Sequence, residues 1–353
     1  MTSMSSSVRK ILDHHSIEAS APCRIDSGGT WDIKAMALPM ERIKPVTFNI
    51  ALNLRTWVNL FPFKEGWIRV SSEGFPRGEP YPQNRVPFNS PYGLFFAAIS
   101  HFGFNGLQVQ IRSESPVKSA LGGSSTALIA LIKALSKLSA LRDGKKLSGS
   151  EILHLGYHLE DGVSGGNCGV QDQAAAVYGG VNRWLWRYGE KSSSFNRESL
   201  LNIKGQKELS KRILVAYSGK IHASSRINHS WIKDFLSGIT RAGWVKVNEI
   251  VRRLTDAIKE EEWNRAANLL RDEMAVRREI TPDALIPMSE KLIGQAEGSG
   301  CGARFTGAGA GGSIWALGEV ERIRDLKQIW EPTLASIKGA RILDCKIDPI
   351  GVR

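Results

Sequence analysis

The segment from Pro116 to Thr126 constrains the fold of this 353-residue chain more than any other. A period-two alternation at Leu107–Arg112 predicts a strand before it, and an apolar run at Ser124–Leu138 predicts a buried helix after it. The N–H groups at such a helix N-terminus lack partners and favour anions, and Gly122 and Gly123 would let a phosphate approach. We expect a phosphate-binding turn here, with an ordinary helix cap as the alternative. No Lys-Ser or Lys-Thr pair follows the glycines, which excludes a Walker A loop.

A second glycine-rich run, Thr306–Gly312, contains a formal G-x-G-x-x-G pattern. In a dinucleotide-binding domain a helix follows that pattern. Here the strand pattern Ser313–Leu317 follows, so we expect a tight strand–loop–strand connection instead. Uninterrupted Gly and Ala residues favour the close approach of two main chains, or of a main chain and a ligand. A sterically tight hairpin without a ligand is the alternative.

Two carboxylates flank a third glycine-rich stretch. Glu160 ends one predicted helix and Asp172 begins the next. A carboxylate beside such a turn could act as a general base, and a second carboxylate could bind Mg²⁺. The alternative for Asp172 is an acid that stabilises a helix start. His154 and His158 face the same side of the first helix, but no third zinc ligand accompanies them, so we interpret them as a solvated or packed pair.

A fourth segment, Ala21–Asp32, places Arg24 and Asp32 on either side of a Gly28-Gly29 turn. Carboxylates can accept two hydrogen bonds from a polyol, so this arrangement could recognise a sugar. A structural Arg–Asp ion pair is the alternative, and the segment alone favours it.

Composition limits the class of partner. The chain has 47 Lys and Arg residues against 35 Asp and Glu residues, a formal net charge of +12. These charges form only short groups without interleaved aromatic residues, which favours a solvated basic surface over a nucleic-acid site. Four cysteines without a C-x-x-C pair suit a reducing cytosol. No apolar run approaches the ~20 residues that span a bilayer, so we expect neither a nucleic-acid nor a membrane partner.

The length predicts two domains, which we place at residues 1–200 and 201–353. Both halves mix strand and helix patterns, which predicts an α+β fold. The expected strands are Val46–Ile50, Trp57–Phe61, Leu107–Arg112, Ile213–Tyr217, Gly302–Thr306, Ser313–Leu317 and Ala340–Leu343. The expected helices are Tyr92–Phe102, Ser124–Leu138, Gly149–Glu160, Asp172–Tyr178, Ser224–Gly238, Gly243–Glu260 and Trp263–Glu279.

In their order and separation, the four segments resemble the motifs of the GHMP kinase superfamily, which includes galactokinase, mevalonate kinase and homoserine kinase. Ala21–Asp32 is similar to the first motif of fucokinases and heptose-phosphate kinases. Pro116–Thr126 resembles the phosphate-binding motif, and Arg304–Gly312 resembles the third, glycine-rich motif. Leu159–Gln173 is similar to the catalytic segment of the fucokinase branch. The resemblance implies a two-domain α+β fold, with an N-terminal domain like ribosomal protein S5 domain 2 and a ferredoxin-like C-terminal α/β sandwich.

The resemblance also implies roles for individual residues. Asp172 would take the proton from the attacking hydroxyl, and Arg24 would stabilise charge near the transferred phosphoryl group. Mg²⁺ would be held by Ser124 or Ser125 together with Glu160. The ATP phosphates would contact Ala120, Leu121, Gly122, Gly123, Ser124, Ser125 and Thr126. The substrate would contact Asp32, Gly28, Gly29, Gly307, Gly309 and Gly311.

Three departures from the family pattern affect these roles. Ala120 stands where the phosphate-binding motif usually has Gly, and Gly123 replaces a Ser. The first motif is also about one residue shorter than usual, which affects the assignment of Asp32.

The resemblance implies an ATP- and Mg²⁺-dependent sugar kinase that phosphorylates an anomeric hydroxyl and yields a sugar 1-phosphate. Fucose-, galactose- and heptose-phosphate-type substrates all fit. One alternative is a mevalonate-type small-alcohol kinase, which the Gln171-Asp172-Gln173 context disfavours. Another is a non-catalytic sugar or nucleotide sensor on the same fold. We expect a cytoplasmic monomer or homodimer whose partners are ATP and a sugar or sugar phosphate.

Overall fold

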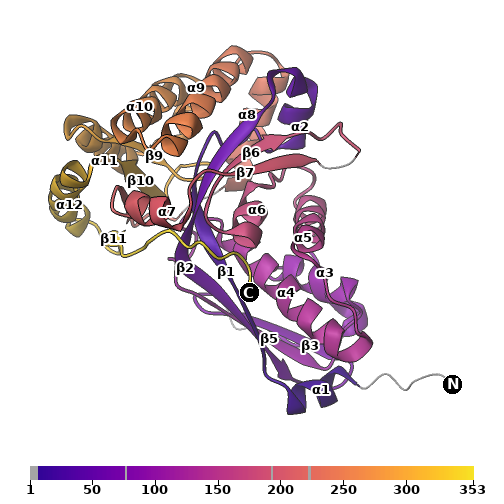
Figure 1. The fold of residues 1–353 in the computed structure, drawn as a ribbon. Coiled ribbons are helices and arrows are strands. Elements are labelled where there is room, and N and C mark those ends of the chain that lie inside the picture. The colour runs from indigo at the N-terminus through magenta and orange to yellow at the C-terminus, as the bar shows by residue number, and fades with distance from the viewer. Residues whose placement is uncertain (1–6, 76–77, 192–193, 222–223) are drawn as a thin grey trace.

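The structure is a computed structural model that describes residues 7–75, 78–191, 194–221 and 224–353, without the side chains of residues 224–226. Its first half is built on a seven-stranded sheet with the order β4-β3-β5-β2-β6-β7, and β1 pairs with β2 outside this path (Figure 1). The β3–β5 pair is parallel and the others are antiparallel. The strands are β1 (Ile17–Ser27), β2 (Val46–Pro62), β3 (Trp67–Ser72), β4 (Tyr81–Pro82), β5 (Leu107–Ser113), β6 (Val181–Trp186) and β7 (Phe195–Ser199).

The long strand β2 organises this sheet. One edge of β2 pairs with β1 along nearly its whole length. The other edge pairs with β6 from Val46 to Ile50 and with β5 from Thr56 to Pro62. The strands expected at Val46–Ile50 and Trp57–Phe61 are therefore two parts of the single strand β2. None of the expected strands corresponds to β1. The pairing register between β1 and β2 shifts between Pro22 and Cys23.

Helices pack on this sheet and bury the core of the first half. They are α1 (Val8–His14), α3 (Gly93–His101), α4 (Gly123–Asp143), α5 (Gly149–Val163) and α6 (Gln171–Tyr178), joined by the short helices α2 (Lys34–Ala37), η1 (Leu38–Ile43) and η2 (Gln83–Arg85). By length and composition α4 could cross a membrane, but 72% of its most apolar stretch is buried inside the protein. It packs against β1, β2, α5 and α6 as a core helix.

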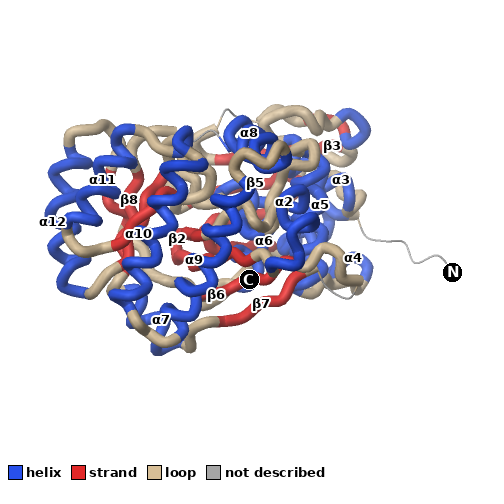
Figure 2. Tube along the Cα trace, turned by 90° about the horizontal axis from the view of Figure 1, so that it is seen from above, coloured by secondary structure: helices blue, strands red, loops and turns tan. Residues whose placement is uncertain are grey.

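The second half contains a four-stranded antiparallel sheet with the order β11-β8-β10-β9. Its strands are β8 (Ile213–Tyr217), β9 (Gly302–Phe305), β10 (Ser313–Leu317) and β11 (Arg341–Leu343). Several of its helices, α10, α11 and α12, pack against these strands (Figure 2). The helices of this half are α7 (Ile203–Ser210), α8 (Ser224–Leu236), α9 (Arg241–Lys259), α10 (Trp263–Ile280), η3 (Pro282–Ala284), α11 (Pro287–Gly298) and α12 (Val320–Ala335).

The two halves share one hydrophobic core. Helix α9 packs on β2, so Phe48 and Ile50 of the first sheet lie in one buried cluster with Trp244 and Val251. In the sequence, one sheet precedes residue 200 and the other follows it, but the shared buried cluster contains residues from both sides. The domain boundary at residue 200 therefore stays a prediction. Arg353 lies beside strand β1. Its main chain exchanges two hydrogen bonds with the main chain of Ser20, each 3.0 Å long.

Candidate functional site

A cavity of about 810 Å³ contains residues from both halves of the chain. The first half contributes the turn before α4, the start of α6 and part of β1. The second half contributes part of α8 and the start of the glycine-rich loop after β9. All four segments singled out in the sequence therefore contribute to this one cavity.

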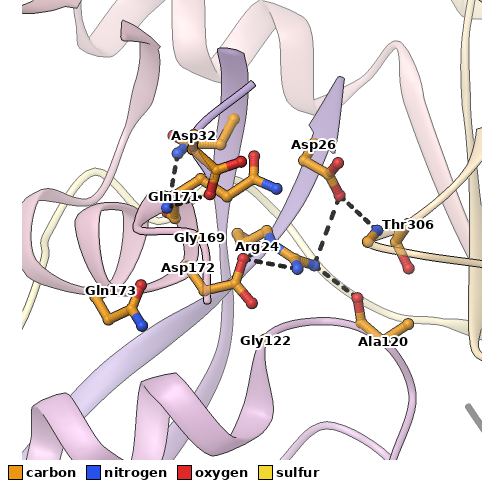
Figure 3. Close-up of polar contacts among 12 residues, drawn as sticks. Arg24, Asp26, Asp32, Ala120, Gly122, Gly169, Gln171, Asp172, Gln173 and Thr306 are labelled. Carbon is orange, nitrogen blue, oxygen red and sulfur yellow. Dashed lines mark hydrogen bonds and ion pairs between the residues drawn. The ribbon is translucent and has the colours of Figure 1, made fainter. Parts of the chain in front are cut away.

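Arg24 and Asp172 form the central contact of the cavity (Figure 3). Arg24 comes from β1, and Asp172 comes from the first turn of α6. The Nε of Arg24 donates to Oδ1 of Asp172 at 2.8 Å, and Nη2 lies 2.7 Å from the same oxygen. The guanidinium is only 5% exposed, whereas the carboxylate is 23% exposed. One partner is thus fixed inside the protein while the other faces the cavity.

The charge of Arg24 is strongly favoured at this position. Burial works against its positive charge, but the carboxylates of Asp172 and Asp26 outweigh burial and raise the pKa of the guanidinium. Its Nη1 also donates to the main-chain oxygen of Ala120 at 2.6 Å. Arg24 therefore links Asp172 directly to the turn predicted to bind phosphate.

The turn before α4 has an unusual backbone. Lys118, Ala120 and Gly122 have φ angles of 54°, 62° and 77°, all in the left-handed region. Such a conformation costs a residue with a Cβ about 1–2 kcal/mol, so Ala120 holds a backbone conformation that glycine would adopt at lower cost. At Gly122 a Cβ would lie 3.2 Å from Oδ2 of Asp172. Glycine thus lets the turn approach the carboxylate.

The seven residues predicted to contact ATP do not all face the cavity. Ala120, Gly122, Gly123, Ser124 and Ser125 line it. Leu121 is fully buried, and its main-chain oxygen accepts a hydrogen bond from the Arg24 N–H at 3.1 Å. The Thr126 hydroxyl donates back to the Gly122 oxygen at 2.8 Å. Among these seven residues, the two serine hydroxyls are therefore the side-chain groups placed to meet a phosphate or its metal.

Glu160 is partly buried near the start of α4. Burial raises the pKa of its carboxyl to about 7, the charge of Asp172 adds to this effect, and hydrogen bonds from Ser125 and Gln173 oppose it. The Gln173 amide donates to Oε2 at 2.6 Å. An oxygen set of one carboxylate and serine hydroxyls fits Mg²⁺, which keeps several waters and takes its remaining ligands from substrate phosphates. In the described part of the chain, no group of three or more His, Cys, Asp or Glu side chains forms a metal cluster.

Asp32 lies on the opposite side of Asp172 from the glycine turn, close to α6 (Figure 3). Its Oδ2 accepts from the Gln171 N–H at 2.9 Å, and its Oδ1 accepts from the Thr30 N–H at 3.1 Å. Burial raises the pKa of this carboxyl to about 6 despite the hydrogen bond from Gln171, and the charge of Asp172 adds to the increase. A second carboxylate is therefore held beside Asp172 at the surface of the cavity.

The glycines predicted to contact substrate occupy different positions. Gly29 and Gly307 line the cavity. A Cβ on Gly28 would lie 2.9 Å from a methyl group of Val251, and one on Gly309 would lie 2.5 Å from the Ala284 oxygen. The space beside Gly311 is filled by the main-chain oxygens of residues 220 and 221. These three glycines permit close packing of the chain against itself, and their role toward a substrate stays a prediction.

Sequence reasoning missed two groups of lining residues. An apolar group lies at one end, and polar and aromatic residues of α8 lie on the side of the second half. These residues are Phe75, Tyr92, Phe95, Ile111 and Val117 in the first group and Asn228, His229 and Trp231 in the second. No local pattern distinguishes them from ordinary core or surface residues, because the fold alone brings them together.

Comparison with known proteins agrees with this geometry. Residues 89–180 match the model for the GHMP kinases N terminal domain. A mevalonate kinase from Thermococcus onnurineus is 25% identical over 86% of this chain and 90% of its own length. The bifunctional fucokinase/GDP-fucose pyrophosphorylase of Arabidopsis thaliana is 23% identical over 69% of this chain and 24% of its own length. The crystal structure of Lactococcus lactis galactokinase complexed with galactose superposes with a TM-score of 0.73 at 16% identity, covering 96% of this chain and 95% of that one.

These matches confirm the resemblance to the GHMP kinase superfamily. Residues 89–180 are similar to the GHMP kinase N-terminal domain, and the chain has the α+β fold of these kinases. The family match spans the glycine turn, Glu160 and Asp172, and ends at Gly180. The cavity between the halves, which contains these residues, is therefore the candidate active site.

Proposed function

We propose that the chain is an ATP-dependent sugar kinase that transfers the γ-phosphoryl group of ATP to the anomeric hydroxyl of a sugar. The observation that carries this proposal is the Arg24–Asp172 contact beside the N-terminus of α4. It places a carboxylate that can accept a proton next to main-chain N–H groups that favour an anion. Phosphoryl transfer depends mainly on such positioning and charge stabilisation.

Asp172 is the proposed base. Its carboxylate, which lines the cavity, would accept the proton of the sugar hydroxyl while that hydroxyl oxygen forms a bond to the γ-phosphorus. The bond between the γ-phosphorus and the β,γ-bridging oxygen breaks, and ADP leaves. Arg24 holds the Asp172 carboxylate in place and provides positive charge near the transferred group.

The residues that would hold Mg²⁺ are Ser124 or Ser125 together with Glu160. When bound, Mg²⁺ would neutralise charge on the ATP phosphates. The apolar end of the cavity, which includes Phe75, Tyr92 and Ile111, would receive the adenine base. Both assignments belong to the proposal.

The acceptor end favours a polyhydroxyl compound. Asp32, Asn167 and Asn228 offer polar groups there, and Trp231 adds an aromatic surface. Among the described residues that line the cavity, the Arg and Lys residues are Arg24, which is paired with Asp172, and Lys118, which lies in the phosphate turn. A neutral sugar therefore fits this end better than the carboxylate of mevalonate.

A mevalonate-type kinase is the second candidate, and the similarity to the Thermococcus onnurineus enzyme favours it. A non-catalytic sensor would retain the cavity without turnover. Cytoplasmic location and a monomeric or homodimeric state remain parts of the proposal.

The test is a screen for ADP formation from ATP and Mg²⁺ with free sugars, sugar phosphates and mevalonate. We expect ADP formation that depends on a sugar. Dependence on mevalonate alone would replace the proposal with the second candidate. ADP formation with none of the acceptors, together with measurable nucleotide binding, would favour the sensor.

A further inference from the structure

Asp26 is a buried carboxylate that joins three parts of the site without lining the cavity. It lies two residues after Arg24 on β1 and is fully buried. Its Oδ1 accepts a hydrogen bond from the Gly307 N–H at 2.7 Å, and its Oδ2 accepts one from Nη1 of Arg304 at 2.8 Å. The same Oδ1 lies 3.6 Å from Nη1 of Arg24 (Figure 3). One carboxylate thus contacts the Arg24 guanidinium and the glycine-rich loop of the second half.

The ionised form of Asp26 is the stable one. Burial disfavours its charge, but Arg304 and Arg24 outweigh burial and lower the pKa of its carboxyl. A buried charge is costly unless it is paired and hydrogen-bonded. The contacts with Arg304, Gly307 and Arg24 supply both conditions, so the carboxylate is fixed in the interior.

Glu273 on α10 is a second buried carboxylate in the same network, with different contacts. Its Oε1 accepts from the Gly28 N–H at 3.0 Å and lies 3.5 Å from Nε of Arg304. Its Oε2 accepts from the Ser27 hydroxyl. Glu273 therefore shares Arg304 with Asp26, and among the described residues its polar contacts are with Ser27, Gly28 and Arg304 rather than with Arg24 or Gly307. The two carboxylates form a natural pair of test and control.

Three polar partners set the orientation of the Arg24 guanidinium. Nε and Nη2 face Asp172, whereas Nη1 faces the Ala120 oxygen and Asp26. Removal of the Asp26 charge would leave Nη1 held by the Ala120 oxygen, which belongs to the turn with left-handed φ angles. It would also weaken the hydrogen bond from the Gly307 N–H, whose residue borders the cavity, because a neutral amide oxygen accepts less strongly than a carboxylate.

We propose that Asp26 is a positioning residue that fixes the Arg24 guanidinium and the Gly307 main-chain N–H relative to each other. It would thereby align charge-stabilising groups from both halves on the transferred phosphoryl group. This inference rests on the proposed kinase function. Asp26 itself would touch neither substrate nor ATP.

The test compares Asp26→Asn with Glu273→Gln as the matched control. Each variant removes one buried negative charge from the Arg304 network, so both should lower the thermal unfolding midpoint. Only Asp26→Asn should lower kcat, by about tenfold to a hundredfold, with KM for ATP nearly unchanged. Equal kcat values for the two variants would overturn the inference.

A double-mutant cycle distinguishes action through Arg24 from a general structural defect. In an Arg24→Lys background, Asp26→Asn should lower kcat by much less than in the wild type, because the group that it positions is already lost. Additive losses of kcat would overturn the inference.

If Asp26→Asn does not fold, Asp26→Glu replaces it, because this change keeps the buried charge near Arg304 but moves the carboxylate by one methylene group. The same loss of kcat is expected, and a kcat equal to that of the wild type would overturn the inference. A wild-type protein that transfers phosphoryl groups to no acceptor would instead overturn the proposed function, and the inference with it.

Discussion

The carboxylate of Asp32 occupies the space beside the α-carbon of Gly169. A Cβ on Gly169 would overlap Oδ2 of Asp32 and lie 2.7 Å from its Cγ. Gly169 is not among the glycines with a positive φ, so its main chain does not need glycine for conformational reasons. Glycine is required here for the close approach alone. This contact helps to hold Asp32 beside Gln171 and Asp172.

The substitution Gly169→Ala should therefore displace Asp32 without straining the main chain. We expect KM for the acceptor to rise about tenfold or more, while KM for ATP changes little. Gly162→Ala is the matched control, because nothing lies within 4 Å of a Cβ at that position. Steady-state kinetics with each substrate varied in turn measure both effects. An unchanged acceptor KM in Gly169→Ala would remove Asp32 from the acceptor site.

Asp172→Asn should abolish turnover. The amide cannot accept the proton of the acceptor hydroxyl at neutral pH, and a general base contributes about a hundredfold to ten-thousandfold to a rate. Nucleotide binding should persist, because the turn before α4 is unaltered. Turnover is measured by ADP release and binding by calorimetry with ADP. If Asp172→Asn turns over at the wild-type rate, Asp172 is not the base.

The hydroxyls of Ser124 and Ser125 are expected to serve Mg²⁺ or the ATP phosphates. Ser124 is exposed and Ser125 is buried, and both line the cavity. Ser124→Ala and Ser125→Ala should each be measured for the Mg²⁺ and ATP concentrations that give half-maximal rate. At least one variant should need about tenfold more Mg²⁺ or ATP. If both variants match the wild type, the assignment of the phosphate turn is wrong.

The buried Asp32 carboxyl predicts a specific dependence of stability on pH. Its pKa is about 6 in the folded chain, against an ordinary value of 3.8. The folded state therefore binds this proton more tightly than the unfolded state. Its contribution to the free energy of unfolding falls as pH rises from about 4 to 6, and the full penalty is present above that range.

Asp32→Asn removes this ionisation. Relative to the wild type, the variant should gain up to about 3 kcal/mol in free energy of unfolding between about pH 4 and pH 7.5. The loss of one main-chain hydrogen bond to the carboxylate costs the same free energy at both pH values, so it does not affect this gain. Urea unfolding of both proteins at both pH values measures the gain. A difference that stays constant with pH would contradict a raised pKa for Asp32.

The C-terminal segment should contribute strongly to stability through one buried ion pair. Arg55 on β2 lies 2.5 Å from Asp348 and also donates to the main-chain oxygens of residues 350 and 351. Asp348→Ala leaves a buried guanidinium without its carboxylate, so the free energy of unfolding should fall by about 3 kcal/mol. The exposed Asp344 in the same segment is the control, and Asp344→Ala should cost less than about 0.5 kcal/mol. Equal effects would show that the ion pair contributes nothing.

Local rules made much of the fold predictable. The start of α4 follows from small residues before an apolar run, and the Ser148–Glu151 capping box at the start of α5 is present as its sequence implies. Strand β1 was missed because ten of its eleven residues are buried, which removes the alternation that identifies a strand with one exposed face. Helix α12 contains Pro332, a residue that normally argues against a helix interior.

The candidate site was predictable only in part, because sequence patterns reveal local residue types and not contacts between distant segments. Arg24, Glu160 and Asp172 carry chemistry in short glycine-rich segments, so they stand out in the sequence. The overlap of Gly169 with Asp32 and the bridging position of Asp26 depend on contacts between distant segments. No local pattern records such contacts.

The measurement that tests the account most directly is the structure of the phosphorylated product. Wild-type protein is incubated with ATP, Mg²⁺ and the best acceptor from the screen, and the product is examined by phosphorus NMR. We predict a phosphate monoester coupled to the anomeric proton of a sugar, and no such product with Asp172→Asn. A phosphorylated mevalonate with no sugar phosphate, or no phosphoryl transfer to any acceptor, would contradict the account.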